Sequence, residues 1–336
     1  MNRMVGAENE ASAPSSSPSS GSRRIALPDL GATLDRAEGQ LLRANADAEM
    51  AHAALHELFL ALHVWRFQAD EEQWQRAVTQ CRAHPLLGLV HQDPFTFRAF
   101  DKPRGYAGDA CLMDFIYRVE DGGPLPQVLP IGRFVYDYLT ANPACQGVRS
   151  RRAVVAELVD RLAAERPRPH VLSIAAGHLR EANLSVAIRR RRLGRLLAVD
   201  SDAESLAEVS ACYGHLGVET LPASFRTLLG NKAWRGQFDL VYSTGLFDYL
   251  SLRTGRRLVL AMYQMLRPGG SLVIANFLPG VLDTGYMEAF MDWKLVYRSR
   301  QDMIELTRDI PESGIRQIQL RSEEAQNILF LELTRS

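Results

Sequence analysis

The chain has 336 residues, and its 39 lysine and arginine residues balance its 39 aspartate and glutamate residues. The length allows one large or two ordinary domains, and a formal net charge of zero gives no general attraction for nucleic acid or for an acidic membrane. No apolar run is long enough to cross a bilayer, and the N-terminus lacks the apolar core of a secretion signal. We therefore expect a cytoplasmic protein that does not bind nucleic acid and is not stably inserted in a membrane.

The composition changes twice along the chain. Residues 1–28 are rich in Ser, Pro, Ala and Gly, and we expect a disordered tail because such a segment buries too little apolar area to become ordered. A helical N-terminal domain or lid is predicted for residues 29–166, and a second domain for residues 167–336. The helical prediction rests on apolar residues at helical spacing over residues 30–82, 110–120, 131–142 and 151–165.

Two features of the helical region suggest chemistry. His52, His56 and His63 fall on nearly one helix face, but no cysteine or suitably spaced acidic residue completes a ligand set, so we predict no metal site. The four cysteines, which are scattered without C-x-x-C spacing, also favour neither a metal cluster nor a disulfide framework. Residues 102–109, KPRGYAGD, are typical of a structured loop, which either carries function or simply connects two helices with Asp109 as the N-cap of the second.

The second domain alternates short apolar runs with helical segments. This alternation predicts a doubly wound, Rossmann-like α/β fold with a seven-stranded sheet, whose last two strands form an antiparallel hairpin. The predicted strands are residues 171–174, 196–199, 218–221, 238–242, 271–277, 315–320 and 327–333, and the predicted helices between them are residues 180–192, 202–213 and 254–267.

A nucleoside site is predicted where the first strand ends. Ala175, Ala176 and Gly177 would let the backbone approach a ligand closely. Asp200 ends the next strand, about where a carboxylate accepts hydrogen bonds from ribose hydroxyls. A dinucleotide site needs G-x-G-x-x-G, and only Gly177 is present, which disfavours a nicotinamide oxidoreductase. S-adenosyl-L-methionine, which lacks a pyrophosphate, fits this turn better. The alternative to a cofactor site is that this segment is a buried strand and turn that binds no ligand.

Four segments in this order, VLSIAAGHLRE, LLAVDSD, FDLVYSTGLFDYL and MLRPGGSLVIANF, resemble class I S-adenosylmethionine-dependent methyltransferases. The likeness covers residues 167–336. It departs from the family at Ser173, where an acidic residue is usual, and in having fewer glycines. The resemblance implies a cofactor-binding set of Ala175 and Gly177 against the cofactor, Asp200 on the ribose, Ser224 and Phe225 near the adenine, and Thr244 and Gly245 beneath the methionine moiety, with Glu181 and Ser201 beside them.

A narrower likeness concerns the acceptor. The segments KPRGYAGDACLMDFIY and GYMEAFMDWKLVYR resemble bacterial methyltransferases of 3-hydroxypalmitic acid methyl ester biosynthesis. The resemblance implies a small-molecule substrate, with a fatty- or hydroxy-acid carboxylate as the leading expectation. There are two alternatives. The protein is an N- or O-methyltransferase of a specialised metabolite, or it is a catalytically silent regulator that binds S-adenosylmethionine. The oligomeric state is left open, a homodimer being one option.

Methyl transfer needs alignment and exclusion of water more than it needs acid–base groups. An ionised carboxylate needs no general base, whereas an amine or hydroxyl acceptor would be helped by Asp109, Asp248 or Asp292. His178, in the turn itself, suits a structural position at the cofactor edge better. The predicted catalytic residues are Tyr106, Asp109, Asp248 and Tyr286, and the predicted substrate-binding residues are Tyr249, Phe290, Trp293 and Tyr297. Core packing is the alternative for the aromatic residues at 286–297.

Overall fold

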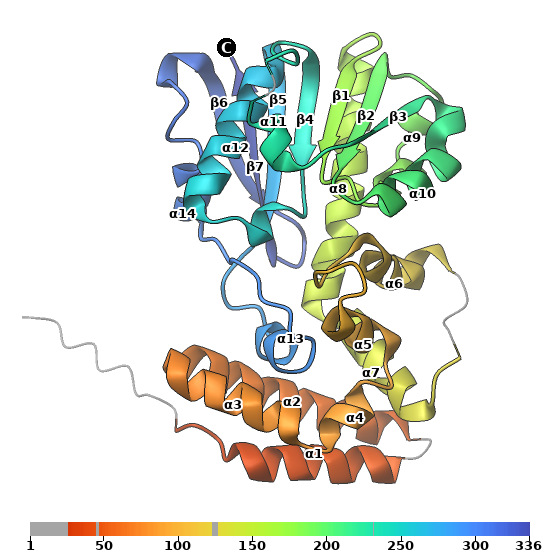
Figure 1. The fold of residues 1–336 in the computed structure, drawn as a ribbon, viewed down its shortest axis with the longest axis vertical. Coiled ribbons are helices and arrows are strands. Elements are labelled where there is room, and N and C mark those ends of the chain that lie inside the picture. The colour runs from red at the N-terminus through yellow and green to blue at the C-terminus, as the bar shows by residue number, and fades with distance from the viewer. Residues whose placement is uncertain (1–25, 45–46, 123–126, 231) are drawn as a thin grey trace, which may run out of the picture.

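A computed structural model describes residues 26–44, 47–122, 127–230 and 232–336, and its chain forms a helical part and an α/β part stacked on one another (Figure 1). Of the predicted tail, residues 1–25 lie outside the described residues. Among the described residues, no helix combines the length and the apolar character that crossing a membrane requires.

Helices make up the first half of the chain, as predicted. The stretch expected to be helical over residues 30–82 is divided into three helices, because Asp47 and Asp70 each cap a new one, accepting hydrogen bonds from the N–H groups of Met50 and Gln73. The helices are α1 (Leu30–Ala44), α2 (Ala48–Gln68), α3 (Glu71–Ala83), α4 (Leu86–Val90), α5 (Pro94–Asp101), α6 (Ala110–Asp121), α7 (Pro130–Ala141) and α8 (Pro143–Glu165).

The second half forms a seven-stranded sheet in the order β3-β2-β1-β4-β5-β7-β6. Strands β1 to β5 are parallel, and β7 runs antiparallel between β5 and β6. The predicted Rossmann-like α/β fold with a closing antiparallel hairpin is confirmed. The strands are β1 (His170–Ile174), β2 (Arg195–Asp200), β3 (Val218–Pro222), β4 (Phe238–Ser243), β5 (Leu266–Phe277), β6 (Ile315–Ser322) and β7 (Ile328–Arg335).

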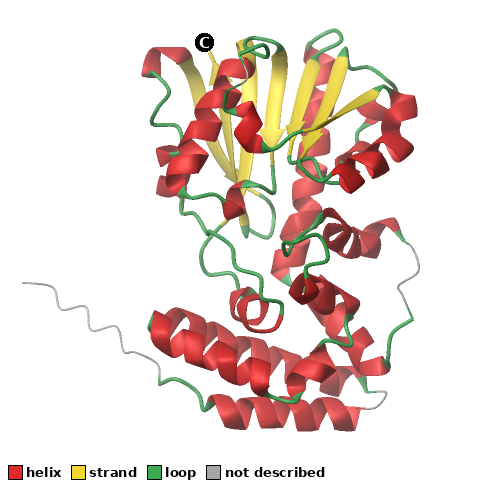
Figure 2. Cartoon of the chain, viewed as in Figure 1, coloured by secondary structure: helices red, strands yellow, loops and turns green. Residues whose placement is uncertain are grey.

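Helices cover both faces of this sheet (Figure 2). Successive strand residues point to opposite faces, so Val171 packs into the core shared with the helical part, and Leu172 packs into the core under α12 and α14. The remaining helices are α9 (Val186–Arg189), α10 (Ala203–Tyr213), α11 (Phe225–Leu228), α12 (Leu252–Met265), α13 (Thr284–Phe290) and α14 (Arg300–Glu305), with 3-10 turns at Arg180–Asn183, Gly214–Leu216, Phe247–Tyr249 and Glu312–Gly314.

Three further predicted elements differ in the structure. Helix α8 begins at Pro143, eight residues before the start of the helix predicted over residues 151–165. The helix predicted over residues 180–192 is a 3-10 turn followed by the short α9, because the carboxylate of Asp160 accepts hydrogen bonds from the Ser185 hydroxyl and from the N–H groups of Val186 and Ala187 and so starts a new helix there. Strand β5 begins at Leu266 instead of residue 271, since residues 266–270 continue the extended chain.

Helix α13 belongs to the second half of the sequence but packs in the helical part, against α2 and α3. The contact with α2 is close at Gly285, where a Cβ would lie 2.5 Å from the carbonyl oxygen of Leu62. The absence of a side chain at this position therefore sets how near the two helices come.

Gly285→Ala should lower the free energy of unfolding by about 1–3 kcal/mol, because the added methyl group meets backbone that cannot rotate away. Chemical denaturation followed by circular dichroism measures this. Gly88→Ala in α4 is the matched control: nothing lies within 4 Å of its Cβ position, and the change should be neutral or stabilising by roughly 0.5–1 kcal/mol. Equal stability of the two variants would contradict the close packing of α13.

Candidate active site

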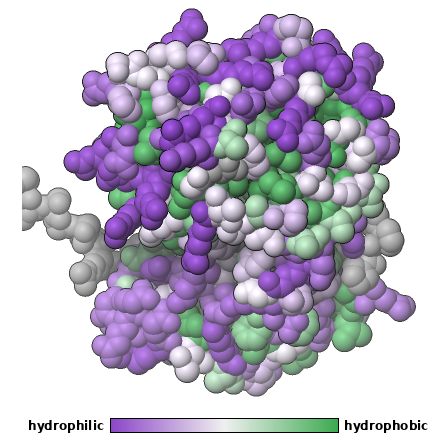
Figure 3. Space-filling view, turned by 45° about the horizontal axis from the view of Figure 1, so that its top comes forward, coloured by the Kyte–Doolittle hydropathy of each residue, from purple (hydrophilic) through white to green (hydrophobic). Residues whose placement is uncertain are grey.

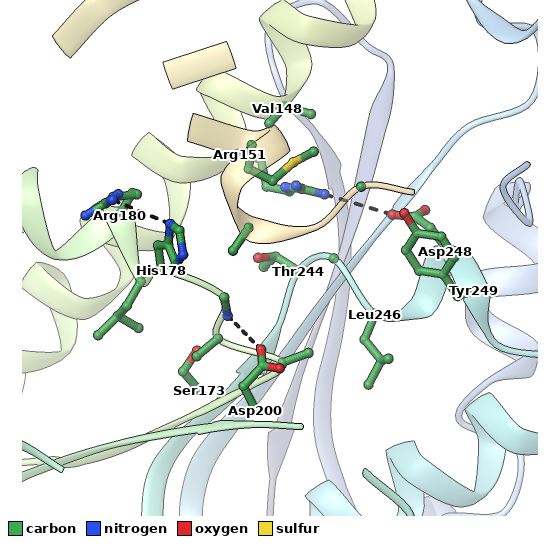
Figure 4. Close-up of a pocket in the computed structure, with 18 of the residues that line it drawn as sticks. Val148, Arg151, Ser173, His178, Arg180, Asp200, Thr244, Leu246, Asp248 and Tyr249 are labelled. Atoms are coloured by element: carbon green, nitrogen blue, oxygen red, sulfur yellow. Dashed lines mark hydrogen bonds and ion pairs between the residues drawn. The ribbon is translucent and has the colours of Figure 1, made fainter. Parts of the chain in front are cut away.

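A cavity of about 390 Å³ lies beyond the carboxyl ends of β1, β2 and β4, where the helical part meets the sheet (Figure 4). In open α/β sheets ligands bind at this edge, and the volume lies in the usual range for small-molecule sites. The lining comes from three regions: the loop after α5 with α6 (Tyr106, Gly108, Ala110, Met113, Asp114, Tyr117), helix α8 (Val148, Arg151), and the sheet edge with its following loops (Ser173–Glu181, Asp200, Ser201, Phe225, Thr244–Leu246, Asp248, Tyr249, Phe277, Trp293, Leu295).

The turn after β1 forms one wall. Ala175 and Gly177 both have positive φ angles, of 53° each. Glycine adopts this conformation freely, whereas alanine is strained by roughly 1–2 kcal/mol. A Cβ at Gly177 would lie 3.3 Å from the Cβ of Ala110 in α6, so the turn and the helical part approach closely at this glycine. The small residues predicted here leave backbone, not side chain, at the cavity wall.

The Asp200 carboxylate holds this turn in place. One oxygen accepts a hydrogen bond from the Gly177 N–H at 2.8 Å, and the other accepts one from the Asp202 N–H at 2.9 Å. Figure 4 shows the first of these bonds. Each carboxylate oxygen retains further acceptor capacity, and Asp200 lines the cavity while being only 8% exposed. The side chain therefore faces the cavity as well as its own backbone.

The half-buried Glu181 and the buried Tyr242 form a pair under the same wall. The Tyr242 hydroxyl donates to Glu181 Oε1 at 2.6 Å. Burial raises the pKa of the Glu181 carboxyl, and the Tyr242 hydrogen bond offsets this in part. Glu181 thus presents a polar group to the cavity.

A cation and a carboxylate face each other across the cavity. Arg151, from α8, is only 6% exposed, and its Nη1 lies 3.9 Å from Asp248 Oδ2 (Figure 4). The other Asp248 oxygen accepts from the Phe277 N–H at 2.9 Å. Burial raises the pKa of Asp248 to about 6, although the charge of Arg151 lowers it. The long Arg151–Asp248 contact leaves the guanidinium able to take a closer anion.

Asp114 of α6 joins the helical part to the turn after β1. Its carboxylate accepts two hydrogen bonds from Arg180, at 2.8 and 2.7 Å, and lies 2.8 Å from His178 Nδ1. Burial would raise the pKa of Asp114, but these contacts hold it at about 2. Burial also lowers the pKa of His178, but its contact with Asp114 helps to raise that pKa to about 9. The imidazole is therefore a cation at neutral pH.

The loop 102–109 covers the cavity and is fastened on two sides. On one side the Arg104 guanidinium contacts Asp202 and donates to the Ser205 hydroxyl at 2.8 Å. On the other side Lys102 pairs with Asp292. Further along the loop, Gly108 packs so closely against its neighbours that a Cβ there would lie 2.4 Å from the Tyr249 hydroxyl oxygen.

The structure brings most predicted site residues to this cavity. Twelve of them line it: Tyr106, Ala175, Gly177, Glu181, Asp200, Ser201, Phe225, Thr244, Gly245, Asp248, Tyr249 and Trp293. Tyr106 is 41% exposed at the loop, and Trp293 Nε1 donates to the Tyr249 hydroxyl at 2.8 Å. Their roles remain predictions.

Five predicted site residues lie outside the cavity lining: Asp109, Ser224, Tyr286, Phe290 and Tyr297. Asp109 is buried as the N-cap of α6 and is bound by two nitrogens of Arg98, so both its oxygens are occupied within the fold. Ser224 likewise caps α11. The aromatic rings of Tyr286 and Phe290 are fully buried in the core, where Tyr286 stacks on Phe59 at 4.4 Å.

The candidate base Asp292 and the histidines of α2 also have positions outside the cavity. Asp292 binds Arg82 and Lys102. His56 Nδ1 lies 3.1 Å from the Tyr138 hydroxyl. Among the described residues, one group has ligand atoms close enough for a metal ion, the partly exposed Asp35, Glu38 and His84, and it does not line the cavity.

The His178 imidazole should titrate near pH 9 in the native protein, above its ordinary value of 6.5. Because the folded pKa is the higher one, protonation of His178 stabilises the fold fully below pH 6.5, and this contribution is lost as the pH rises through 9. In Asp114→Asn the pKa of His178 should fall towards 6.5 and that pH dependence of stability should shrink.

NMR titration of the histidines, and denaturation measured across pH 6 to 10, would test the pKa of about 9 for His178. Asp35→Asn, which removes the partner of the separate His84 at 3.1 Å, is the control and should leave His178 unchanged. A native His178 that titrates near 6.5 would show that Asp114 does not hold it as a cation.

Comparison with known proteins bears on this geometry. Residues 174–274 match the family model of a methyltransferase domain. No curated protein matches the chain. A solved structure of a possible exported protein from Bordetella parapertussis is 17% identical, with a TM-score of 0.53 over 95% of this chain and 99% of its own. That match extends the shared fold through the helical part.

Two further solved structures cover less of the chain. Magnesium protoporphyrin IX methyltransferase from Synechocystis PCC 6803, with bound S-adenosylhomocysteine, is 12% identical over 66% of this chain and 93% of its own, with a TM-score of 0.45. The N-methyltransferase NodS from Bradyrhizobium japonicum WM9 is 14% identical over 55% and 96%, with a TM-score of 0.39. The family-model match over residues 174–274 and the order of the sheet together show the Rossmann-like fold of class I methyltransferases. Domains of this class use S-adenosyl-L-methionine as their cofactor.

Proposed function

We propose that this protein transfers the methyl group of S-adenosyl-L-methionine to the carboxylate of a small amphipathic acid, forming a methyl ester. The observation that carries the proposal is a single covered cavity with a fixed carboxylate, Asp200, at the sheet edge and a buried cation, Arg151, on the helix opposite. The first suits a nucleoside sugar, and the second suits an anionic acceptor.

The residues at the sheet edge fit the cofactor. Asp200 keeps acceptor capacity for ribose hydroxyls, and the turn at 175–177 leaves space that larger side chains would fill. Phe225 lines the cavity and would lie against the adenine. Thr244 and Gly245 would lie beneath the methionine moiety. When bound, the cofactor's sulfonium supplies an activated methyl group.

The walls near Arg151 fit an apolar acceptor with an acidic head. Met113, Val148, Phe277 and Leu295 line the cavity, and all are apolar. An acid bound there would place its carboxylate on Arg151 and its hydrocarbon portion on these side chains. The guanidinium would orient one carboxylate oxygen towards the methyl carbon, on the side opposite the sulfur.

The chain's own residues then have simple tasks. The carboxylate oxygen forms the new bond to the methyl carbon as the carbon–sulfur bond breaks, and the bonding pair stays on sulfur, so no proton needs to move. The loop 102–109 and α6 exclude water, which would otherwise solvate the carboxylate and weaken it as a nucleophile. Arg151 supplies alignment, and no general base is required.

A hydroxyl acceptor is the second candidate, and Asp248 favours it. This carboxylate lines the cavity, and burial raises its pKa to about 6, which is suited to a general base at neutral pH. In that case the rate would fall as the pH drops below about 6, because Asp248 would become protonated.

Asp200→Ala should weaken cofactor binding by roughly 1–3 kcal/mol, because charge-assisted hydrogen bonds to the sugar are lost. Calorimetry with S-adenosylhomocysteine measures the dissociation constant. Glu204→Gln is the control: this exposed carboxylate lies four positions further along the chain and does not line the cavity, so it should leave the dissociation constant nearly unchanged, whereas a general electrostatic effect would appear in both variants. An unchanged dissociation constant in a folded Asp200→Ala protein would remove Asp200 from the cofactor site.

Arg151→Gln should raise the KM for an acid acceptor roughly tenfold or more and leave affinity for S-adenosylhomocysteine nearly unchanged. Asp248→Asn should retain turnover of a carboxylate acceptor but lose turnover of a hydroxyl acceptor. Initial rates on panels of fatty acids, hydroxy acids and alcohols distinguish these outcomes.

A different result would reassign the guanidinium. If Arg151→Gln weakens S-adenosylhomocysteine but not methylthioadenosine, which lacks the amino-acid carboxylate, then Arg151 holds the cofactor and not the acceptor. If the wild-type chain binds S-adenosylmethionine yet methylates nothing in a cell extract, the silent-regulator alternative would replace an enzymatic function.

A further inference from the structure

A second cavity lies at the opposite edge of the sheet, where the strands begin. It has a volume of about 270 Å³ and is formed by the segments that enter β1, β2 and β3. Three of its lining residues are arginines, Arg168, Arg191 and Arg195, and none of its described lining residues is acidic. Aliphatic and glycine residues complete it: Ile188, Leu193, Gly194, Leu196, Leu216, Gly217 and Val218.

The positive charge in this cavity is only partly neutralised. Arg195 donates two hydrogen bonds to Glu219, at 3.0 and 2.8 Å. Arg168 and Arg191 are exposed and have no ion pair within the described part of the chain. Figure 3 shows hydrophilic residues over much of the surface that it presents. The exposed Arg190 and Arg192 lie on either side of Arg191 in sequence. Because the whole chain is neutral, this charge is a local feature.

The backbone presents the two unpaired arginines in an unusual way. Arg168 has a φ of 51° and Arg191 a φ of 52°, a left-handed conformation that glycine would adopt without strain. The segments are also fastened together: the Gly194 N–H donates to the Pro169 carbonyl at 2.9 Å, and a Cβ at Gly194 would lie 2.3 Å from the Arg168 carbonyl oxygen. The arginines therefore start from a fixed backbone, which reduces the entropy lost when a ligand binds.

We propose that this arginine pocket, defined by Arg168, Arg191 and Arg195, binds a phosphate or pyrophosphate group of a small molecule or of a lipid headgroup. Guanidinium groups form paired hydrogen bonds to phosphate oxygens. The aliphatic floor would accommodate the non-phosphate portion of such a ligand. The pocket shares no lining residue with the cavity at the carboxyl ends of the strands, so the proposal does not depend on methyl transfer.

Calorimetry on the full chain with inorganic pyrophosphate, and then with ADP, tests the site. We expect saturable binding that the double variant Arg168→Gly, Arg191→Gly weakens roughly tenfold or more. Glycine is chosen because it removes both guanidiniums and also relieves the left-handed backbone strain, so the melting temperature should not fall. Loss of binding in a protein of undiminished stability cannot then be attributed to unfolding.

Arg253→Gln, Arg257→Gln is the matched control, since these exposed arginines lie on α12 and outside the pocket. It should leave pyrophosphate binding unchanged. Co-sedimentation with phosphatidylcholine vesicles, with and without phosphatidylglycerol, separates the two sources of phosphate. Vesicle binding that needs phosphatidylglycerol and is lost only in the glycine variant, without ADP binding, assigns a lipid headgroup. Equal loss in both double variants, or no binding of any of these probes, would overturn the proposal.

Discussion

A single carboxylate fixes the shape of the candidate active site. At the carboxyl edge of a parallel sheet the strands end, and the N–H groups of the loops that follow no longer have ladder partners. Asp200 accepts hydrogen bonds from two such groups, at Gly177 and Asp202, and so ties the loop after β1 to the start of α10. The same carboxylate lines the cavity. Cofactor recognition, as proposed, therefore uses a group whose first task is to satisfy buried backbone.

Ion pairs join the helical part to this frame. Asp114 reaches Arg180 and His178 in the turn after β1, and Arg104 reaches Asp202 beside Asp200. These contacts are partly shielded from solvent, so they are stronger than exposed surface pairs. They also place α6 and the loop 102–109 over the cavity, which is where a methyl-transfer reaction benefits from the exclusion of water.

The sequence allowed the sheet to be predicted because each buried strand is a short apolar run between turn signals, and the position of Asp200 follows from where β2 ends. It did not indicate Arg151 or Asp114, because each lies in an ordinary helix and meets the cavity only after folding. Tyr286 is predicted to be catalytic and Phe290 to bind the substrate because an aromatic stripe has the same spacing in a core as in a binding site, and both side chains are fully buried in the structure. The broken helix at 180–192 depends on a carboxylate, Asp160, supplied from another helix.

Helix α13 constrains how the protein can open. The chain leaves the sheet after β5, contributes α13 to the contact with α2 and α3, and returns as α14, while α8 links the two parts a third time. Several covalent connections and a close-packed Gly285 oppose a hinge between the parts. Binding of ligands in the cavity and their release would then depend on local opening of residues 102–109. Breaking the ion pairs of Lys102 and Arg104 costs less free energy than moving the whole helical part as a rigid body.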